Sequence, residues 1–507
     1  MAKEFRALVE NLVSAHAFLV QPVVGAFVAA LRNGPATLSI KYDRIHNVLS
    51  SVIRLIPTGL TFMTTILNEY FPHKTEDVAD NVWYTKNLMR IVSYAPVLRN
   101  AVWAIVIDRM MQMDVEIQGA LEKLDEEEYS TVLAHCFEID SASVDPEMIS
   151  FILDENNEED DAESASDEEE VDDEDEDDDE DDDDEDAPVI VSDFRKMSGR
   201  LDSMLHYLMT QVTEVFNSSA AITNEESFEF FSVLLQIFER TVLPTHQCKY
   251  VQFLYFHATS LSQSCTEHFL VRLAQRTFDT GSPALLRVAA SAYLSSFVAR
   301  AKFVRPDNVM YCIKMLNSWA LSYVEEYEPT LKVTSGGVVV MEGGGKMQHT
   351  VFYAVVQALL YVFCFRWREI VDSSVGVGSG GVPAEMNGFQ RIVMSKFAPM
   401  SVCSRTVVAE FARITHKLDM MYVYAHMQGQ QPMEVAAGEY LEAFFPFDPC
   451  HLLLSKRLIE RHYNEWSEEE ETAASSVPNG GAGGKGFDSD VDFISHSFEN
   501  QMSLSAD

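Results

Sequence analysis

The 507-residue chain can bury a large core, because 47% of its residues are hydrophobic, and its length allows two to four domains. The formal net charge is −42, and 26 acidic residues without a basic one lie between Asp154 and Asp186, so the difference, −16, falls on the rest of the chain. Such acidity argues against broad electrostatic binding of nucleic acid and favours protein partners.

The cysteines and the apolar runs indicate in which cellular compartment the protein is expected. Seven scattered cysteines without a CxxC pair argue against a disulfide framework or a zinc site and favour a reducing compartment. Glu4 and Glu10 interrupt the first apolar pattern, which a secretory signal would not tolerate. The longest apolar run, 351–365, is shorter than a span of about 20 residues, so we expect a soluble intracellular protein without a membrane partner.

Helical spacing fills residues 2–124, with breaks at 33–35, 57–59, Pro72 and Pro96. In the clearest segment one apolar stripe is formed by Leu98, Val102, Val106, Met110, Met113 and Ile117. Alternating strand patterns are almost absent, which argues against the sheet of an α/β enzyme.

An acidic tract then interrupts the helical pattern. Repulsion among so many like charges prevents a packed structure, so we predict a disordered acidic loop at residues 154–192. Ser164 and Ser166 each have an acidic residue three positions on, the spacing that an acidophilic kinase of the casein kinase II type reads. Phosphorylation would add more negative charge, although any serine in an acidic run fits this spacing.

The second half begins at Phe194 and contains the most self-consistent helix, which we predict between Ser282 and Pro306. Ser282 can cap its first N–H groups, the next residue is a proline at the first helical position, and Pro306 stops it. Its apolar residues recur at steps of three or four, which predicts one core face, with Ser291 and Ser295 on the face toward solvent.

Further helices are expected at 308–324, 350–371, 388–396 and 405–418, with glycine-rich loops at 335–345 and 374–382. The GGGK sequence in the first loop lacks the leading glycine and the final Ser or Thr of a phosphate-binding loop. Helix pairs recur about every 40 residues, the period of HEAT-type repeats. We therefore predict an all-α fold, a HEAT-like helical repeat solenoid with a disordered acidic loop.

The predicted domains are N-terminal helical repeats at 1–153, the acidic loop at 154–192, C-terminal helical repeats at 193–466 and a flexible tail at 467–507. No catalytic or metal-binding constellation stands out, because the histidines lie singly and paired carboxylates abound only in the predicted disordered loop. We predict that the chain is not an enzyme and uses no cofactor or metal.

Basic residues near aromatic ones are candidates for contact with promoter DNA or an acidic protein surface. They are Arg366 and Arg368 beside Trp367, and Lys456, Arg457 and Arg461 around one helix near the end of the aromatic block. A solvated helix face that complements the helix dipole would explain the same residues.

Four stretches, in order, resemble the TIF-IA family of RNA polymerase I-specific initiation factors, in which small residues precede Y-x-x-S-F-x-A-R-A-K-F. They are RLIPTG (54–59) with FPHK (71–74), LRNAVWAIVIDRMMQMDVEIQ (98–118), AASAYLSSFVARAKFV (289–304) and FFPFDPCHLLLSKRLIERHYNEW (444–466). The resemblance implies an α-solenoid in the nucleus and nucleolus that binds RNA polymerase I through its stalk and bridges it to core promoter factors for ribosomal RNA synthesis.

The resemblance also implies phosphoserines in the acidic loop, and a serine-bearing N-terminal surface that meets the polymerase, for which Ser50 and Ser51 beside RLIPTG are the candidates. It associates the C-terminal region with core promoter factors and a weak contact to promoter DNA, which favours the Lys456 group. The glycine-rich loops and the tail after 472 depart from the family's pattern.

Two alternatives remain open. The first is a helical-repeat nuclear carrier or assembly adaptor that binds basic cargo, such as histones or ribosomal proteins, through its acidic loop. The second is an enzyme with a diffuse site, against which the missing nucleophile, base and metal constellations argue.

Overall fold

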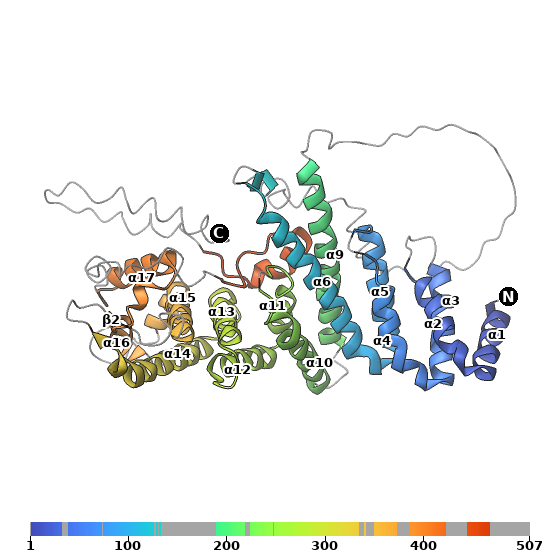
Figure 1. Ribbon diagram of the computed structural model, residues 1–507, viewed down its shortest axis with the longest axis horizontal. Coiled ribbons are helices and arrows are strands. Elements are labelled where there is room, and N and C mark those ends of the chain that lie inside the picture. The colour runs from blue at the N-terminus through green and yellow to red at the C-terminus, as the bar shows by residue number, and fades with distance from the viewer. Residues whose placement is uncertain are drawn as a thin grey trace. The chain divides into compact units, whose positions relative to one another are not determined.

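A computed structural model describes residues 2–32, 39–73, 75–125, 128–129, 131–132, 189–218, 224–246, 248–333, 339–340, 349–372, 386–421 and 444–466. The described residues are almost entirely helical (Figure 1). Their one strand pair joins β1, Lys332–Val333, to β2, Val339–Val340, antiparallel. The all-α prediction is therefore confirmed.

The chain groups into two compact units. Unit 1 comprises Met1–Leu208 with His451–Ser455, and unit 2 comprises Met209–Cys450 with Lys456–Asp507. The domain boundaries predicted from the sequence stay a prediction. The helix α9, Val189–Ser218, begins directly after Pro188, so residues 189–192 of the predicted acidic loop are helical, and 154–188 lie outside the described residues.

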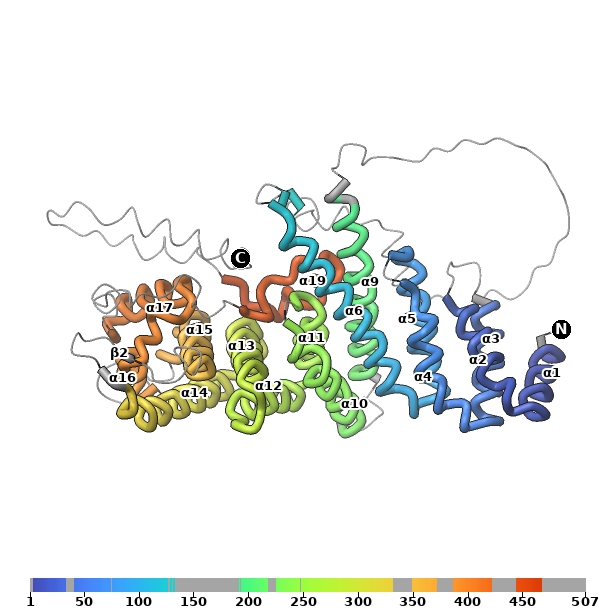
Figure 2. The backbone as a smooth tube through the Cα atoms, in the orientation of Figure 1, coloured from blue at the N-terminus to red at the C-terminus, as the bar shows by residue number. Residues whose placement is uncertain are grey.

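Unit 1 is built from helices joined by short 3-10 turns. They are α1 Ala2–Ala15, η1 Ala17–Leu19, α2 Val20–Ala29, α3 Ser39–Leu55, η3 Pro57–Gly59, α4 Leu60–Glu69, α5 Val78–Tyr94, η4 Pro96–Leu98, α6 Arg99–Leu121 and the first part of α9. Helix α3 packs between α1 and α5, while α4 packs between α2 and α6, so the helices form two layers (Figure 2). This layering confirms the HEAT-like repeat prediction for unit 1.

The same corner recurs three times in unit 1. The corner residues are His16, Ile56 and Ala95, which lie 40 and 39 residues apart. Their φ and ψ angles are nearly equal, at −135° and 83°, −129° and 79°, and −131° and 68°. In each corner the carbonyl accepts a hydrogen bond of 2.9 Å from the N–H three residues on. The predicted period of about 40 residues is therefore present in the backbone.

Unit 2 is a second helical array. Its elements are α10 Asn224–Ile237, the π turn η5 Phe238–Val242, α11 Phe253–Ser260, α12 Gln263–Phe278, α13 Ala284–Arg300, α14 Pro306–Tyr327, η6 Glu328–Thr330, α15 Thr350–Asp372, α16 Phe389–Val393, η9 Pro399–Ser401, α17 Arg405–Lys417 and η10 Glu460–His462. Helix α13 packs against α12 and α15, and α15 also contacts α14 and α17. The helix α19, Leu453–Ile459, spans the boundary of the two units in sequence.

The central helix differs from its prediction at both ends. Pro283 itself is the N-cap of α13, and the Ser282 hydroxyl donates to Asp279 instead of capping the helix. The helix ends at Arg300, and Pro306 begins α14 rather than stopping α13. Proline is suited to a first helical turn because its fixed φ is already helical and no N–H is lost there.

The predicted solvent face of α13 is also wrong. Ser291 and Ser295 are 0% and 1% exposed, because α13 lies between α12 and α15. The Ser291 hydroxyl donates to the Ala354 carbonyl of α15 at 3.2 Å. A serine hydroxyl that donates a hydrogen bond to a backbone carbonyl can be buried at such a helix contact.

Helix α15 contains the longest apolar run and is 23 residues long, so the length argument against a membrane span fails. By length and composition α15 could cross a membrane, as could two bent helix pairs in unit 1, 3–29 and 41–69, if each counted as one span. However, 83% of the apolar window of α15 is buried inside the protein. Its neighbours α13, α14 and α17 supply that cover.

Candidate interaction surfaces

Most of the Y-x-x-S-F-x-A-R-A-K-F sequence lies in the core of unit 2, and its lysine, Lys302, is exposed. The Tyr293 and Phe297 rings lie 5.8 and 5.6 Å from the ring of Phe447 in the C-terminal aromatic block. The Ser296 hydroxyl accepts a hydrogen bond of 2.9 Å from the Phe447 N–H. Two stretches about 150 residues apart in the sequence therefore bind each other, and their shared role is structural.

The C-terminal end of α13 is closed by groups from distant parts of unit 2. The Asn464 N–H donates to the Arg300 carbonyl at 2.6 Å, and the Asn464 amide donates to the Ala299 carbonyl at 3.2 Å. The last carbonyls of a helix have no partner within it, so these bonds satisfy groups that would otherwise be buried unpaired.

Arg366 takes part in the same closure, which corrects its prediction as a surface residue. It is 5% exposed, and its guanidinium donates to the carbonyls of Val298 at 3.0 Å and Ala301 at 2.6 Å. A third bond of 2.5 Å joins it to Glu369. Arg366 therefore binds the end of α13 and cannot belong to a surface patch.

Arg368 is exposed and keeps its place as a candidate contact residue. Its guanidinium lies 4.9 Å from the centre of the Trp367 ring, and the Lys417 ammonium lies 5.8 Å from the same ring. Lys417 ends α17, and sequence spacing could not pair it with a residue 49 positions earlier. The fold thus gathers two exposed cations around one indole.

The Lys456 group lies on α19 and η10, and all three of its members are exposed. The N-terminus of α19 is fixed by Asp202 of α9, whose carboxylate accepts hydrogen bonds from the N–H groups of Leu454 at 2.7 Å and Ser455 at 2.9 Å. An acidic side chain at a helix N-terminus is favourable for that helix. Lys456 and Arg457 therefore lie on a well-anchored helix, and Arg461 lies on the turn that follows it.

The structure adds Lys302 to this basic surface. The Lys302 N–H donates to the His462 carbonyl at 2.9 Å, and Ala301 forms a bridge with Tyr463, so the turn after α13 runs beside η10. The Lys302 side chain is exposed. Lys302 comes near Arg461 because the two segments pair in the folded chain, and no local sequence pattern predicts this.

Ser50 and Ser51 lie near the end of α3 and are half-buried. The Ser50 hydroxyl accepts a hydrogen bond of 3.3 Å from Arg54. The stretch RLIPTG beside these docking candidates contains the second of the three corners, so both serines lie within two helical turns of a repeated element.

The three corners expose apolar side chains that sequence reasoning missed. We define the corner edge as Phe18, Leu55, Thr58 and Val97. Phe18 is 75% exposed, Leu55 51% and Val97 81%. Because α1, α3 and α5 form one layer and α2, α4 and α6 the other, the corners that join them lie along one edge of unit 1. The prolines of two corners, Pro57 and Pro96, were the sequence signal for it.

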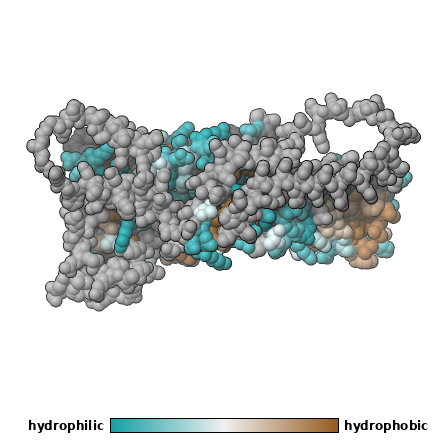
Figure 3. Space-filling model, turned by 90° about the horizontal axis from the view of Figure 1, so that it is seen from above, coloured by the Kyte–Doolittle hydropathy of each residue, from teal (hydrophilic) through white to brown (hydrophobic). Residues whose placement is uncertain are grey.

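Hydrophobic surface is also visible in the space-filling view at the end of unit 1 that contains α1 (Figure 3). There Phe5 is 53% exposed, Leu8 63% and Leu12 40%. These three residues are spaced by three and four positions, so they share one side of α1. Exposed apolar residues that gather in this way are typical of protein contact surfaces.

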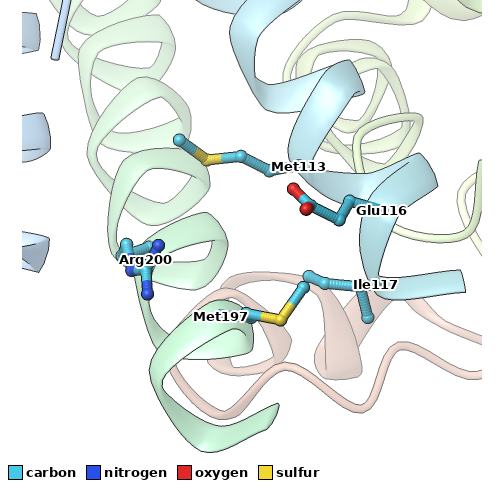
Figure 4. A pocket seen from close by; sticks show the side chains of 5 residues that line it. All are labelled: Met113, Glu116, Ile117, Met197 and Arg200. Atoms are coloured by element: carbon cyan, nitrogen blue, oxygen red, sulfur yellow. The ribbon is translucent and has the colours of Figure 1, made fainter. Parts of the chain in front are cut away.

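A small open pocket lies between α6 and α9 in unit 1 (Figure 4). It is lined by Met113, Glu116, Ile117, Met197 and Arg200. Its empty volume of about 200 Å³, open solvent included, is below the roughly 300 to 1,000 Å³ of ordinary small-molecule sites. Burial lowers the pKa of Arg200, against the opposing charges of Asp77 and Glu116. The pocket offers no constellation for catalysis.

Within the described ranges, no group of three His, Cys, Asp or Glu side chains could hold a metal ion. The ring nitrogens of His46 lie 3.0 Å from the Tyr94 hydroxyl and 2.9 Å from the Asn87 oxygen, and burial lowers its pKa to about 4. The six described cysteines are buried. Burial raises the pKa of the Cys265 thiol to about 11 and that of Cys312 to about 12, so both stay protonated at neutral pH. The GGGK loop and the phosphorylation candidates Ser164 and Ser166 lie outside the described residues.

Comparison with known proteins covers nearly the whole chain. The family model described as RNA polymerase I specific transcription initiation factor RRN3 matches residues 1–471. The initiation factor rrn3 of Schizosaccharomyces pombe is 28% identical over 90% of this chain and 72% of its own length. RRN3 of Mus musculus is 27% identical over 92% of this chain and 70% of its own length.

A solved structure gives the same result for the fold. The crystal structure of RNA polymerase I transcription initiation factor Rrn3 is similar with a TM-score of 0.70 and 25% sequence identity. The similarity covers 92% of this chain and 81% of that one.

Proposed function

The chain belongs to the family of RNA polymerase I specific transcription initiation factors RRN3, and from this premise we propose that it binds RNA polymerase I and recruits it to the ribosomal RNA gene promoter. The match of one family model to residues 1–471 is the observation that carries the proposal. The family consists of initiation factors rather than a known class of enzyme, and its task gives the chain a nuclear role. We propose the nucleolus as its site of action.

The polymerase would dock on the corner edge of unit 1. It exposes the apolar Phe18, Leu55 and Val97 together with the polar Thr58, and Ser50 and Ser51 lie close to its middle corner. An apolar centre with a polar surround is the usual composition of a protein contact surface. Phosphorylation of either serine would place charge in that contact and weaken it.

The core promoter factors would meet the basic surface of unit 2. Lys456, Arg457 and Arg461 supply exposed positive charge, and Lys302 extends it, while Arg368 with Lys417 forms a separate group. Weak contact of the same residues with promoter DNA would depend strongly on salt. An acidophilic kinase acting on Ser164 and Ser166 would regulate assembly by adding charge to the acidic stretch.

The carrier alternative is not favoured, because the relatives that this chain matches over most of their length are initiation factors. A transcription assay separates the two ideas. We expect that extract depleted of this protein loses specific initiation from the ribosomal RNA promoter, and that the purified full chain restores it. Restoration by a chain lacking residues 154–186 would still fit the proposal, whereas failure of the intact chain to restore initiation would refute it.

A further inference from the structure

A pair of arginines on α12 carries an inference that the initiation-factor role does not contain. Arg272 and Arg276 lie one helical turn apart, and both donate to the same oxygen, Oε2, of Glu239 at 2.8 and 2.9 Å. Their side chains remain 36% and 39% exposed, whereas that of Glu239 is 12% exposed. Two guanidinium groups are thus held side by side, at the surface, by one carboxylate.

This arrangement leaves donors unused. A guanidinium has five N–H donors, and a carboxylate in a bidentate pair uses both oxygens. Here the second oxygen of Glu239, Oε1, is buried without a hydrogen-bond partner among the described groups. The remaining contact of Arg272 is a long bond of 3.5 Å to Gln275. The pair is therefore positioned by Glu239 but not saturated by it.

The position of Glu239 is fixed by an unusual backbone. It lies in the π turn η5, where the Leu243 N–H donates to the Phe238 carbonyl at 2.9 Å. Phe238 is 1% exposed and packs against the rings of Tyr255 and Phe269 at 5.0 and 5.2 Å. One extra residue in the turn thus keeps Phe238 in the core while Glu239 faces α12. Such π turns are frequent at functional sites.

The charges around the pair favour an anion. Burial acts to raise the pKa of Glu239, but the hydrogen bonds from Arg276 and Arg272 outweigh it, so the carboxylate stays ionised. The nearby Asp279 is occupied by the Gly281 N–H and the Ser282 hydroxyl. His268 also lies near Arg272, and burial followed by that positive charge lowers its pKa.

Arg287, half-buried near Asp279, brings the group to three arginines against two carboxylates. The excess of positive charge favours an anion such as a phosphate monoester, which carries about −1.5 to −2 at neutral pH.

We propose that Arg272 and Arg276 form a binding site for a phosphorylated serine or threonine of a protein partner. The phosphate would take the N–H donors that Glu239 leaves unused, and Glu239 would act as a positioning residue that also competes with the ligand. Planar guanidinium groups held in place bind phosphate oxygens in pairs, which single lysines do not.

The probe is N-acetyl-O-phosphoserine amide, titrated into the full chain and followed by its phosphorus NMR signal. We expect R272Q/R276Q to weaken binding by about tenfold or more, because hydrogen bonds to charged groups are lost. E239Q should tighten binding by about threefold, because a competing negative charge is removed. The matched control R305Q removes an exposed arginine elsewhere in unit 2 and should leave binding unchanged.

Two further arms keep the test decisive. R272K/R276K retains the charge but not the paired donors, so intermediate weakening is expected even if the glutamine pair folds poorly, and circular dichroism checks folding of each variant. Inorganic phosphate and sulfate distinguish a phosphopeptide site from a site for free anions, since the phosphoserine amide should bind more tightly than either. Equal binding of all three anions, no binding by the wild type, or binding unchanged in R272Q/R276Q would overturn the proposal.

Discussion

The two units are helical arrays that are held together differently. In unit 1 each corner is local, since its carbonyl and its N–H donor are three residues apart and the same backbone angles recur three times. In unit 2 the end of the central helix α13 is closed by Arg366 and Asn464, which lie 65 to 165 positions from the carbonyls that they bind. Unit 1 repeats one local rule, whereas unit 2 depends on tertiary pairing.

This difference explains where contact surfaces can form. Local corners leave their outer side chains free, so Phe18 and Val97 are more than 70% exposed. The tertiary closure in unit 2 uses the buried residues of the family motif internally, so these positions maintain the fold, whereas Lys302 of the same motif is exposed.

Among the changes considered, breaking the contacts that close the end of α13 should lower stability the most. Arg366→Ala would remove two charge-assisted hydrogen bonds and leave the Val298 carbonyl buried without this partner, while the Ala301 carbonyl would keep only its bond of 3.2 Å from the Val304 N–H. We therefore expect a loss of about 3 to 5 kcal/mol in the free energy of unfolding. Urea unfolding with hydrogen exchange would place the loss in unit 2. Arg368→Ala, two residues away and exposed, is the matched control and should cost below about 1 kcal/mol. Similar losses in both variants would contradict the closure role.

Acid should affect unit 1 through His46. Burial lowers its pKa to about 4 from an ordinary value of 6.5, so the folded state keeps it neutral while the unfolded state binds a proton. The stabilisation is fully present above pH 6.5 and is lost as the pH falls from 6.5 to about 4, by up to about 3 kcal/mol. Unfolding curves of wild type and His46→Gln, taken through this range, should show a flatter pH dependence in the variant. An equally steep dependence in both would assign the effect to other groups.

A proline substitution tests whether the three corners are equivalent. Two corners have Pro57 and Pro96 directly after the corner residue, while the first has Ala17 there, with His16 in nearly the same conformation. Because this conformation precedes a proline in the other two corners, Ala17→Pro should stabilise unit 1 by about 0.4 to 1 kcal/mol. Thermal unfolding measures the gain, and Pro57→Ala and Pro96→Ala should lose similar amounts. A destabilised Ala17→Pro would mean that the three corners are not equivalent.

The sequence predicted the helices better than it predicted their environments. The stripe from Leu98 to Ile117 is buried as expected, and the breaks at Pro57 and Pro96 are true corners. The first corner was missed because His16 is followed by alanine, so only its backbone shows the repeat.

Surface residues were predicted less well, because exposure depends on neighbours far along the chain. Arg366 and Arg368 are two positions apart and looked alike, yet one binds the end of α13 and the other is exposed. Lys302 and Lys417 joined the candidate residues only through tertiary pairing. Whether Ser50 and Ser51 contact the polymerase stays a prediction.

The most direct test of the docking proposal is the affinity of the purified full chain for purified RNA polymerase I. Phe18→Ser with Val97→Ser changes only exposed side chains of the corner edge, so folding should be retained while the affinity falls by about tenfold. Leu285→Ser, a 72% exposed apolar residue of unit 2, is the matched control and should bind like wild type. Equal affinity of all three chains would contradict docking on the corner edge, and no binding by the wild type would contradict the proposed function itself.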